Sequence, residues 1–263
     1  MEYQRTVLIC QDSSEGILSA IYIAYERRLM PENTDIIAGS IDNYELFTEY
    51  IEIQTDVEKA KKVENTIYKR FGYRTAYYIW CCIYSNQKDK ASIIYHTIAR
   101  GLAKNVWGEL IHMLQEPCIM QLTKIQKNVS NEAHHFKGFL RFMELEGGGL
   151  FARLCPKNNV LPLLAEHFCD RFPKESFLIF DENHNLCLLK EAQGEAFFYH
   201  PCKEEREQLQ KEELNLSDSE RQVRELFRTF HSTIAIKSRE NIYLQRNLLP
   251  LRFRGNMTEF NKG

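Results

Sequence analysis

The stretch FKGFLRFMELEGGGLFARL, residues 136–154, marks a change in the patterning of the chain. Apolar and polar side chains alternate from Phe136 to Leu145, which is the period of two expected for a half-buried strand. The glycines at 147–149 then favour a turn, and residues 150–154 favour a second strand. We therefore predict a β-hairpin at this point of the chain.

Helical spacing dominates the chain before this hairpin. Residues 7–9 predict a short N-terminal strand, and residues 50–53 predict a second one. The pattern Thr55-x-x-Glu58 is a capping box that opens a helix, and the spacing of apolar residues over 74–127 indicates three more helices. The first half of the chain is therefore expected to be mainly helical.

Short helices and strands follow the hairpin. Residues 160–172 have helical spacing, and residues 177–180 and 186–189 form a second predicted hairpin. Ser217 is predicted to cap a further helix. Residues 242–263 are expected to run extended. The pattern predicts an α+β fold. We expect one compact unit built of a mainly helical part at 1–130, a hairpin, helix and hairpin unit at 131–202, and C-terminal helices with a tail at 203–263.

Composition limits the classes of function. The 263 residues include 34 Lys and Arg against 36 Asp and Glu, a net charge of −2, so any binding of nucleic acid must come from a local basic patch. Charged residues interrupt every apolar run, which argues against a membrane helix. The N-terminus has no recognisable secretory signal. We expect a soluble, cytoplasmic protein that has no membrane partner.

The 8 cysteines include no CxxC pair, the spacing that zinc and iron–sulfur sites commonly use. Several lie in apolar runs, as Cys81 and Cys82 do, where a thiol acts as a small buried hydrophobe. We therefore predict that the chain holds no metal and no other cofactor.

Histidines and one aspartate are weak candidates for acid–base or metal chemistry. His167 and Asp170 are three residues apart and would share a helix face, and His134 and His135 are adjacent. No further set of ligands completes a metal site around them, so a structural pairing is the alternative. The candidate catalytic residues are His135, His167 and Asp170.

One face of the predicted strand beginning at residue 137 carries Lys137, Phe139 and Arg141. Alternating cations and a ring resemble the exposed strands of RNA-recognition folds, on which bases stack and phosphates meet cations. The alternative is a half-buried strand whose long cations reach water. We interpret this face as a candidate secondary platform for nucleic acid.

A second basic region lies near the C-terminus. Residues 221–254 contain eight Lys and Arg and two acidic residues, and arginine suits phosphate recognition. On the helix after Ser217 the arginines lie opposite an apolar face that we expect to pack, formed by Val223, Leu226, Phe227 and Phe230. The alternative is that the arginines pair with the acidic segment 203–220. The candidate nucleic-acid contacts are Arg221, Arg224, Arg228, Arg239, Arg246, Arg252 and Arg254.

Four separated segments together resemble a known family. They are HFKGFLRF (135–142), LPLLAEHFCDRF (161–172), TIAIKSREN (233–241) and the ending that starts LPLRFR (249–254). The family is the bacterial "probable DNA metabolism protein" family, whose members are paired with a radical SAM protein assigned to DNA modification or repair. Some relatives are fused to a uracil-DNA glycosylase-like domain. The resemblance implies a role in DNA metabolism, with the radical SAM protein, DNA and a uracil-DNA glycosylase-like protein as partners.

The N-terminal part departs from that family. Members commonly show Asp-Gly-Ser before the position of Glu15, where this chain has Gln11, Asp12 and Ser13. Gln11 and Asp12 also echo the water-activating loop of uracil-DNA glycosylases, but the Pro and Tyr of that loop are missing and no His-Pro-Ser element follows. We predict no glycosylase activity from this chain alone.

Three functions remain open on the sequence. The first is a non-catalytic accessory protein that acts with a radical SAM partner in DNA repair or base modification by binding nucleic acid or the partner enzyme. The second is an enzyme that acts directly on a DNA base, although no catalytic motif is recognised. The third is a scaffold that docks on a partner without touching nucleic acid.

Overall fold

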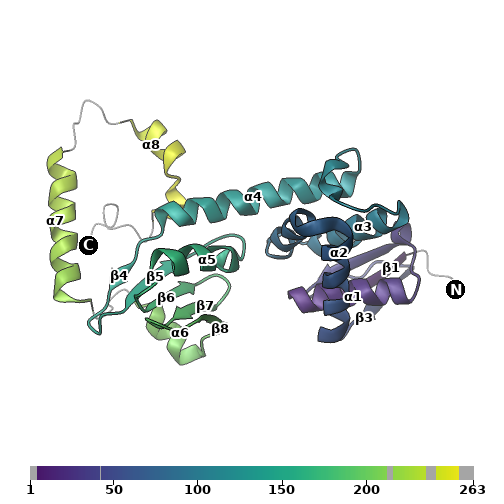
Figure 1. Ribbon diagram of the computed structural model, residues 1–263, viewed down its shortest axis with the longest axis horizontal. Coiled ribbons are helices and arrows are strands. Elements are labelled where there is room, and N and C mark those ends of the chain that lie inside the picture. The colour runs from purple at the N-terminus through teal and green to yellow at the C-terminus, as the bar shows by residue number, and fades with distance from the viewer. Residues whose placement is uncertain (1–4, 42, 212–215, 235–240, 255–263) are drawn as a thin grey trace. The chain divides into compact units, whose positions relative to one another are not determined.

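The computed structural model describes residues 5–41, 43–211, 216–234 and 241–254 (Figure 1). The chain divides into two units, Met1–Ser130 and Asn131–Gly263. Helices and sheets occur in both units, so the predicted α+β class is confirmed. No helix in the described ranges is long and apolar enough to cross a membrane.

A three-stranded parallel sheet organises the first unit. β1 (Arg5–Cys10) lies in the middle and pairs in parallel with β2 (Thr34–Ala38) on one side and β3 (Thr48–Glu52) on the other. α1 (Ser14–Glu26) follows β1 and is capped by the side chain of Ser13. The two strands predicted in this part are confirmed, and β2 is an additional strand that sequence patterning missed.

Two long helices follow this sheet in the chain. α2 (Val57–Ile83) is interrupted at Gly72, whose φ of 75° and ψ of 170° are not helical, and α3 (Lys90–Ala103) comes next. The second half of α2, α3 and α4 (Pro117–Phe139) match the three helices predicted from spacing. The predicted capping box is wrong in one respect, because the residue that caps α2 is Asp56. Its carboxylate accepts the first free amides of the helix.

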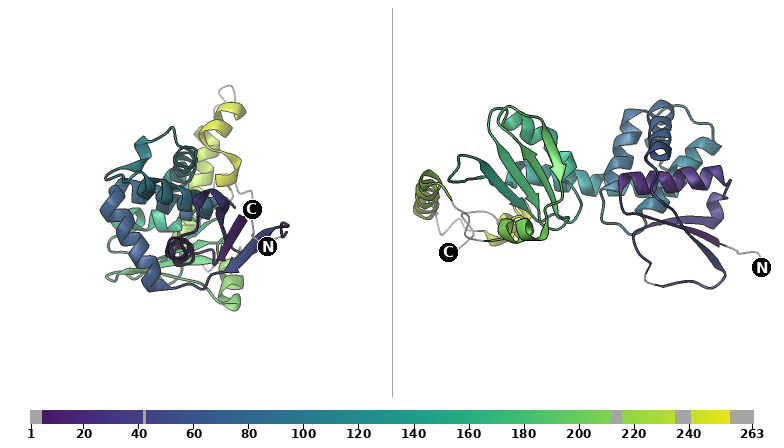
Figure 2. Two further views of the ribbon diagram at one scale, coloured as in Figure 1. Left: turned by 90° about the vertical axis from the view of Figure 1, so that its right-hand side faces the viewer. Right: turned by 90° about the horizontal axis from the view of Figure 1, so that it is seen from below.

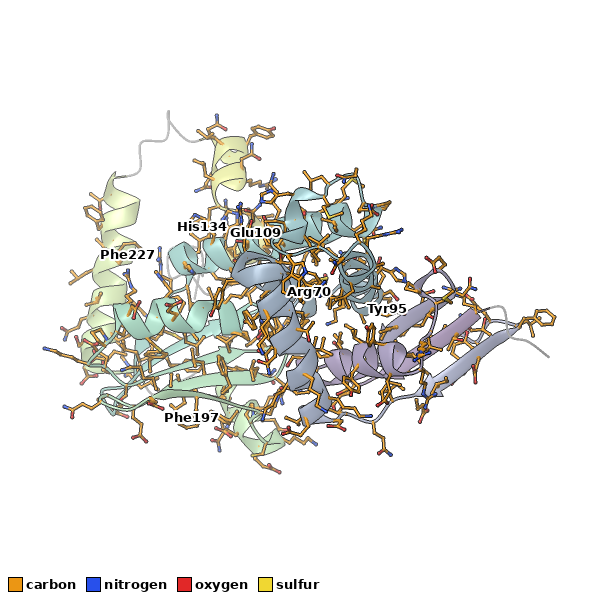
Figure 3. The ribbon with its side chains drawn as sticks, turned by 45° about the vertical axis from the view of Figure 1, so that its right-hand side comes forward. Arg70, Tyr95, Glu109, His134, Phe197 and Phe227 are labelled. Carbon is orange, nitrogen blue, oxygen red and sulfur yellow. The ribbon has the colours of Figure 1, made fainter. Side chains whose placement is uncertain are left out.

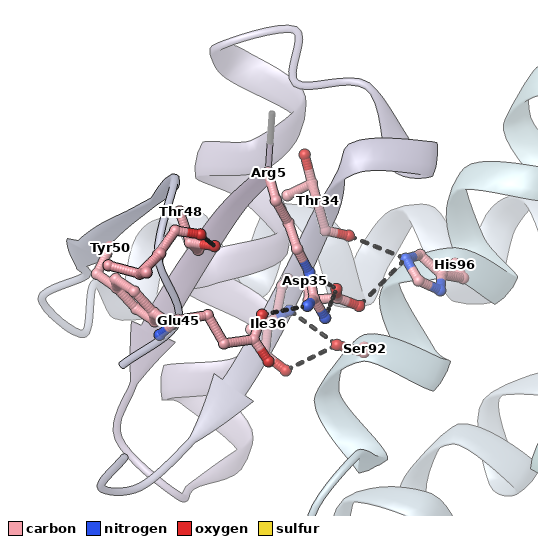
Figure 4. A network of polar contacts seen from close by, with 10 residues as sticks. Arg5, Thr34, Asp35, Ile36, Glu45, Thr48, Tyr50, Ser92 and His96 are labelled. Atoms are coloured by element: carbon pink, nitrogen blue, oxygen red, sulfur yellow. Dashed lines mark hydrogen bonds and ion pairs between the residues drawn. The ribbon is translucent and has the colours of Figure 1, made fainter. Parts of the chain in front are cut away.

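Polar contacts join β2 to α3 (Figure 4). The Ser92 hydroxyl is 2.8 Å from the amide nitrogen and 3.0 Å from the carbonyl oxygen of Ile36, and His96 Nε2 lies 3.0 Å from another backbone carbonyl oxygen of the strand. Asp35 accepts two hydrogen bonds from Arg5, at 2.9 and 2.6 Å, and these bonds raise the pKa of Arg5. α3 thus supplies partners for backbone groups that an edge strand leaves unpaired.

A five-stranded sheet organises the second unit. Its order is β4-β5-β6-β7-β8, and every pair is antiparallel except β5 with β6. The strands are β4 (Met143–Glu144), β5 (Leu150–Leu154), β6 (Phe177–Asp181), β7 (Leu186–Lys190) and β8 (Ala196–Tyr199). The predicted hairpin of β6 and β7 is confirmed, whereas β8 was not predicted.

The parallel pair is joined by α5 (Leu161–Arg171), which confirms the helix predicted at 160–172 and contacts β7 (Figure 2). Leu161, Leu164 and Phe168 are the buried side chains of this helix. Phe151 and Phe180 of the central strands are fully buried with Cys187 and form one core cluster of the unit.

The strand predicted from Phe136 to Leu145 is mostly wrong. α4 continues to Phe139, and β4 contains two residues, which still form a short hairpin with β5. Val129, Ala133 and Phe136 are buried at helical spacing, so burial of this face extends the helix through a segment whose polar pattern also fits a strand.

Three more helices lie in the C-terminal part: α6 (Lys203–Leu209), α7 (Asp218–Ile234) and α8 (Ile242–Leu248). A turn of 3-10 helix follows at Leu251–Phe253. The extended tail predicted from residue 242 is therefore wrong for α8, whose N-cap Asn241 accepts the amide of Leu244 at 2.9 Å. Residues 255–263 lie outside the described part of the chain.

Candidate nucleic-acid and partner interface

An aromatic cluster brings two of the predicted site residues together. The His135 and Phe139 rings stack on α4 with centroids 5.6 Å apart and planes at 13°. Phe253 of the 3-10 helix lies 5.2 Å from His135 and 5.6 Å from Phe139, and it meets Phe136 edge to face. Because Phe253 is buried, these rings hold the C-terminal segment against α4.

Arg252, another predicted contact, is held beside this cluster. Its guanidinium lies 4.6 Å from the centroid of the Phe253 ring, and its Nη1 is 3.4 Å from a carboxylate oxygen of Glu132. Glu132 is 2% exposed and also accepts the amides of Lys157 and Asn158 at 3.0 Å and the Asn158 side chain at 2.6 Å. Arg252 therefore has a structural partner, although part of its side chain remains exposed.

The predicted platform of Lys137, Phe139 and Arg141 does not form one strand face. The first two lie on α4, where residues two apart point in different directions, and Arg141 follows the end of the helix. Phe139 is half-buried in the aromatic cluster, while Lys137 and Arg141 are exposed. The strand-based argument for base stacking is thus wrong, and binding by either cation stays a prediction.

His167 and Asp170 lie on α5 as predicted. Burial, followed by the nearby cations of Lys137 and Arg171, lowers the pKa of His167, which favours the neutral ring. His167 Nε2 is buried and has no hydrogen-bond partner among the described residues. Within the described ranges no three His, Cys, Asp or Glu side chains are placed to hold a metal, so a role for His167 in catalysis stays a prediction.

α7 is attached to the sheet at its first turn. The Ser217 amide donates to the Glu144 carbonyl oxygen at 3.1 Å, and the Ser217 hydroxyl donates to the Glu144 carboxylate at 3.0 Å. Ser217 also accepts the Glu220 amide, as an N-cap does. The start predicted for this helix is therefore confirmed.

The apolar face of α7 does not pack against the described residues. Its side chains are between 42% and 69% exposed, and Figure 3 labels one of them, Phe227. The expectation that this face packs is wrong, because no apolar surface of the described chain covers it. The residues of this α7 face are Val223, Leu226, Phe227 and Phe230.

Two of the predicted arginine contacts are held by the protein itself. Arg224 Nε donates to Glu220 at 2.7 Å, which is a pairing with the acidic segment of the kind considered as the alternative. Arg254 donates from Nε and Nη2 to the Leu249 carbonyl oxygen at 3.1 and 2.9 Å, so it closes the C-terminal end of α8.

Other predicted arginines remain available for binding. Arg221 on α7 and Arg246 on α8 are exposed, and contact of either side chain with phosphate stays a prediction. The side chain of Arg228 and the whole of Arg239 lie outside the described residues. The structure thus retains part of the basic region as a candidate surface.

Sequence reasoning missed a polar group at the carboxyl end of the parallel strands β5 and β6. Asp181 is fully buried; it accepts the amides of Asn183 and His184 at 3.1 Å and faces His184 Nδ1 at 2.8 Å. An aspartate that ends a strand before a turn is the pattern that could have identified it. These bonds fix the turn between β6 and β7.

Cys155 and Glu182 lie at the same end of these strands. The thiol donates to the carboxylate at 3.0 Å, and burial, together with this carboxylate, raises the pKa of Cys155 to about 12. A thiol in this state is a poor nucleophile at neutral pH. The Cys155 thiol is therefore not an activated nucleophile.

Gln11 and Asp12 follow β1 at the carboxyl end of the first sheet. The ammonium group of the buried Lys90 is 2.6 Å from Asp12 and donates to the Ser85 carbonyl oxygen at 3.1 Å. The Thr55 hydroxyl donates to the Gln11 side chain at 3.1 Å. Asp12 thus has a cationic partner, and the absence of glycosylase activity stays a prediction.

Comparison with known proteins gives a family for this chain. No curated protein matches it. The profile of the family described as "Domain of unknown function (DUF4130)" matches residues 88–259, which is well over half of the sequence and includes α3, α4 and the described second unit. The chain therefore belongs to the DUF4130 family.

Proposed function

We propose that this protein is a non-catalytic accessory subunit of a DNA repair or base-modification enzyme. It docks on that enzyme through the exposed apolar face of α7, and its exposed arginines bind nucleic acid that the enzyme holds. The observation that carries this proposal is the continuous apolar face of α7, whose four side chains are 42% to 69% exposed.

The spacing of these side chains favours a protein partner. Val223, Leu226, Phe227 and Phe230 follow the i, i+3, i+4, i+7 pattern of a helix that lies in an apolar groove. Single exposed apolar residues are common on protein surfaces, but a contiguous stripe with two rings is typical of an interface. The resemblance described above supplies the partner, a radical SAM protein.

The arginines support binding of nucleic acid at the same docking site. Arg221 lies on α7 outside the apolar face and is exposed, so it stays accessible when the apolar face is covered. Arginine side chains recognise phosphate groups with two parallel hydrogen bonds. A helix that has an apolar face and an exposed arginine outside it therefore suits an enzyme that already carries DNA.

Co-purification with the neighbouring radical SAM protein tests the proposal. The double variant Leu226→Glu/Phe227→Glu should abolish co-purification, because it places two charges in the apolar interface. Gln222→Glu changes an exposed residue of the same helix and should leave co-purification intact. Retention of the partner by the double variant would overturn the docking model.

The contribution of DNA is measured separately. Arg221→Ala/Arg246→Ala should weaken binding of an oligonucleotide by the complex. The slope of log affinity against log salt should also fall by about one for each phosphate group that these arginines no longer neutralise. Unchanged affinity and slope would show that these arginines do not bind nucleic acid and would favour a protein scaffold.

A further inference from the structure

Three helices of the first unit surround a cavity of about 360 Å³. Ile21 and Tyr22 of α1, Val63 of α2, and Tyr95 and Ile98 of α3 line it, and Figure 3 labels Tyr95 among them. Cavities of roughly 300–1,000 Å³ with apolar and aromatic walls are typical of small-molecule sites. This cavity lies at the lower end of that range.

Two hydroxyl groups of the lining, those of Thr66 and Tyr95, are already hydrogen-bonded. The Thr66 hydroxyl donates to the Lys62 carbonyl oxygen at 2.8 Å, and the Tyr95 hydroxyl donates to the Leu29 carbonyl oxygen at 3.3 Å. Apart from the hydroxyls of Tyr22 and Tyr25, the uncharged part of the lining is apolar or already hydrogen-bonded, so it offers few hydrogen bonds to a polar body such as a nucleobase. The walls favour a body made mostly of carbon.

The charged side chains that line the cavity are cationic. Lys62 and Arg70 both line it, and none of the described residues in the lining is acidic. The Lys62 ammonium lies 5.5 Å from the centroid of the Tyr22 ring. A ligand with one negative charge would be attracted to these side chains.

Arg70 has an unsatisfied donor. Its Nη2 donates to the Asn105 side chain at 2.9 Å, and its guanidinium lies 4.1 Å from the centroid of the Trp107 ring. Its Nε is buried and has no partner among the described residues. A ligand in the cavity would therefore meet the positive charge of this guanidinium rather than the buried Nε.

We propose that this cavity binds a small apolar anion, which is a compact hydrocarbon body that carries one carboxylate or phosphate. A compact body of about a dozen non-hydrogen atoms suits a cavity at the lower end of the range for small-molecule sites. The apolar body lies against Tyr22, Val63 and Ile98, and the charged group lies beside Lys62 and Arg70. The lining residues all belong to the first unit, and none belongs to the docking face of α7.

Calorimetric titration of the full chain with matched probes tests the proposal. Phenylbutyrate carries the charge and phenylbutanol has the same body without it. We expect phenylbutyrate to bind at least about tenfold more tightly, with phenyl phosphate also binding and AMP binding weakly or not at all. Equal affinity for the acid and the alcohol, or no binding of either acid or phosphate, would overturn the proposal. Tighter binding of AMP would overturn it in favour of a nucleotide site.

Variants locate the site. Arg70→Gln and Lys62→Gln should each reduce affinity for phenylbutyrate towards that of the alcohol and leave the alcohol unchanged, whereas Lys69→Gln, an exposed neighbour outside the lining, should change neither. Using two variants guards against a local loss of structure in one. Leu226→Glu should leave binding intact, since the proposed ligand does not bind α7. Loss of binding in that variant, or full binding in both cavity variants, would contradict the assignment.

Discussion

The buried carboxylate of Glu132 is expected to stabilise the loop that follows β5. Replacing Glu132 by alanine removes the acceptor of three hydrogen bonds, from the Lys157 amide and from the amide and side chain of Asn158, and the ion pair with Arg252. Hydrogen bonds to a charged group contribute about 1.5–3 kcal/mol each. The loop can relax after the substitution, so the sum is an upper bound. We expect the free energy of unfolding of the second unit to fall by about 3–5 kcal/mol, the range typical for removing one member of a buried charged group.

Urea unfolding followed by two probes measures this loss. Both tryptophans, Trp80 and Trp107, lie in the first unit, so their fluorescence follows that unit, while far-UV circular dichroism follows both. The part of the dichroism change that fluorescence does not follow reports on the second unit. Glu132→Ala should lower the urea midpoint of that part. Glu166→Ala, which removes an exposed acid of the same unit, should change stability by less than about 0.5 kcal/mol. Unchanged midpoints for Glu132→Ala, or an equal fall in the fluorescence midpoint, would refute the reasoning.

Three further changes test other parts of the structure. Burial and nearby cations lower the pKa of His167 below its usual 6.5, so the unfolded chain binds this proton more readily and the second unit should lose stability as the pH falls below about 6.5. His167→Gln should therefore weaken the pH dependence of the dichroism midpoint between pH 7 and pH 5. An unchanged pH dependence would contradict this. Glu182→Gln should lower the raised pKa of Cys155 and speed alkylation of this thiol severalfold at pH 8. Mass spectrometry of the labelled peptide measures the rate. An equal or slower rate would show that the carboxylate does not hold the thiol proton. Gly16→Ala should lower the fluorescence midpoint by more than an ordinary surface change, because a Cβ at this position would lie 2.3 Å from the Gln11 carbonyl oxygen; a wild-type midpoint would show that the turn after β1 can move.

Elements with strong local features were predictable from the sequence. The start of α7 at Ser217 rests on its capping side chain, and the β6–β7 hairpin rests on two apolar runs around a polar turn. Both depend on interactions between residues close in the chain. The strand β2 has five residues, as the predicted strand β3 does; it was missed because the polar partners that hold it come from α3, which lies far along the sequence.

The last turns of α4 show where local patterning fails. The residues from Phe136 onward fit a strand and a helix about equally in their polar pattern, and burial of Ala133 and Phe136 on one helix face decides between them. The partners of Glu132 are also distant in sequence, since Asn158 is 26 residues away. A buried acid with such partners looks like any exposed glutamate in a sequence, so neither Glu132 nor its role could be predicted.

The size of the α7 face bears on how the proposed docking would work. Full burial of a Leu, Val or Phe side chain contributes roughly 1.5–3 kcal/mol, and the four side chains of the face are about half exposed on average. Covering them would therefore supply roughly 3–6 kcal/mol, which is comparable to the lower estimates, about 4 kcal/mol and upward, of the cost of bringing two proteins together. The apolar face alone would then give a weak complex. Binding of Arg221 and Arg246 to enzyme-bound DNA would add the missing stabilisation, so on the proposed function the complex forms most strongly when the partner already holds its nucleic acid.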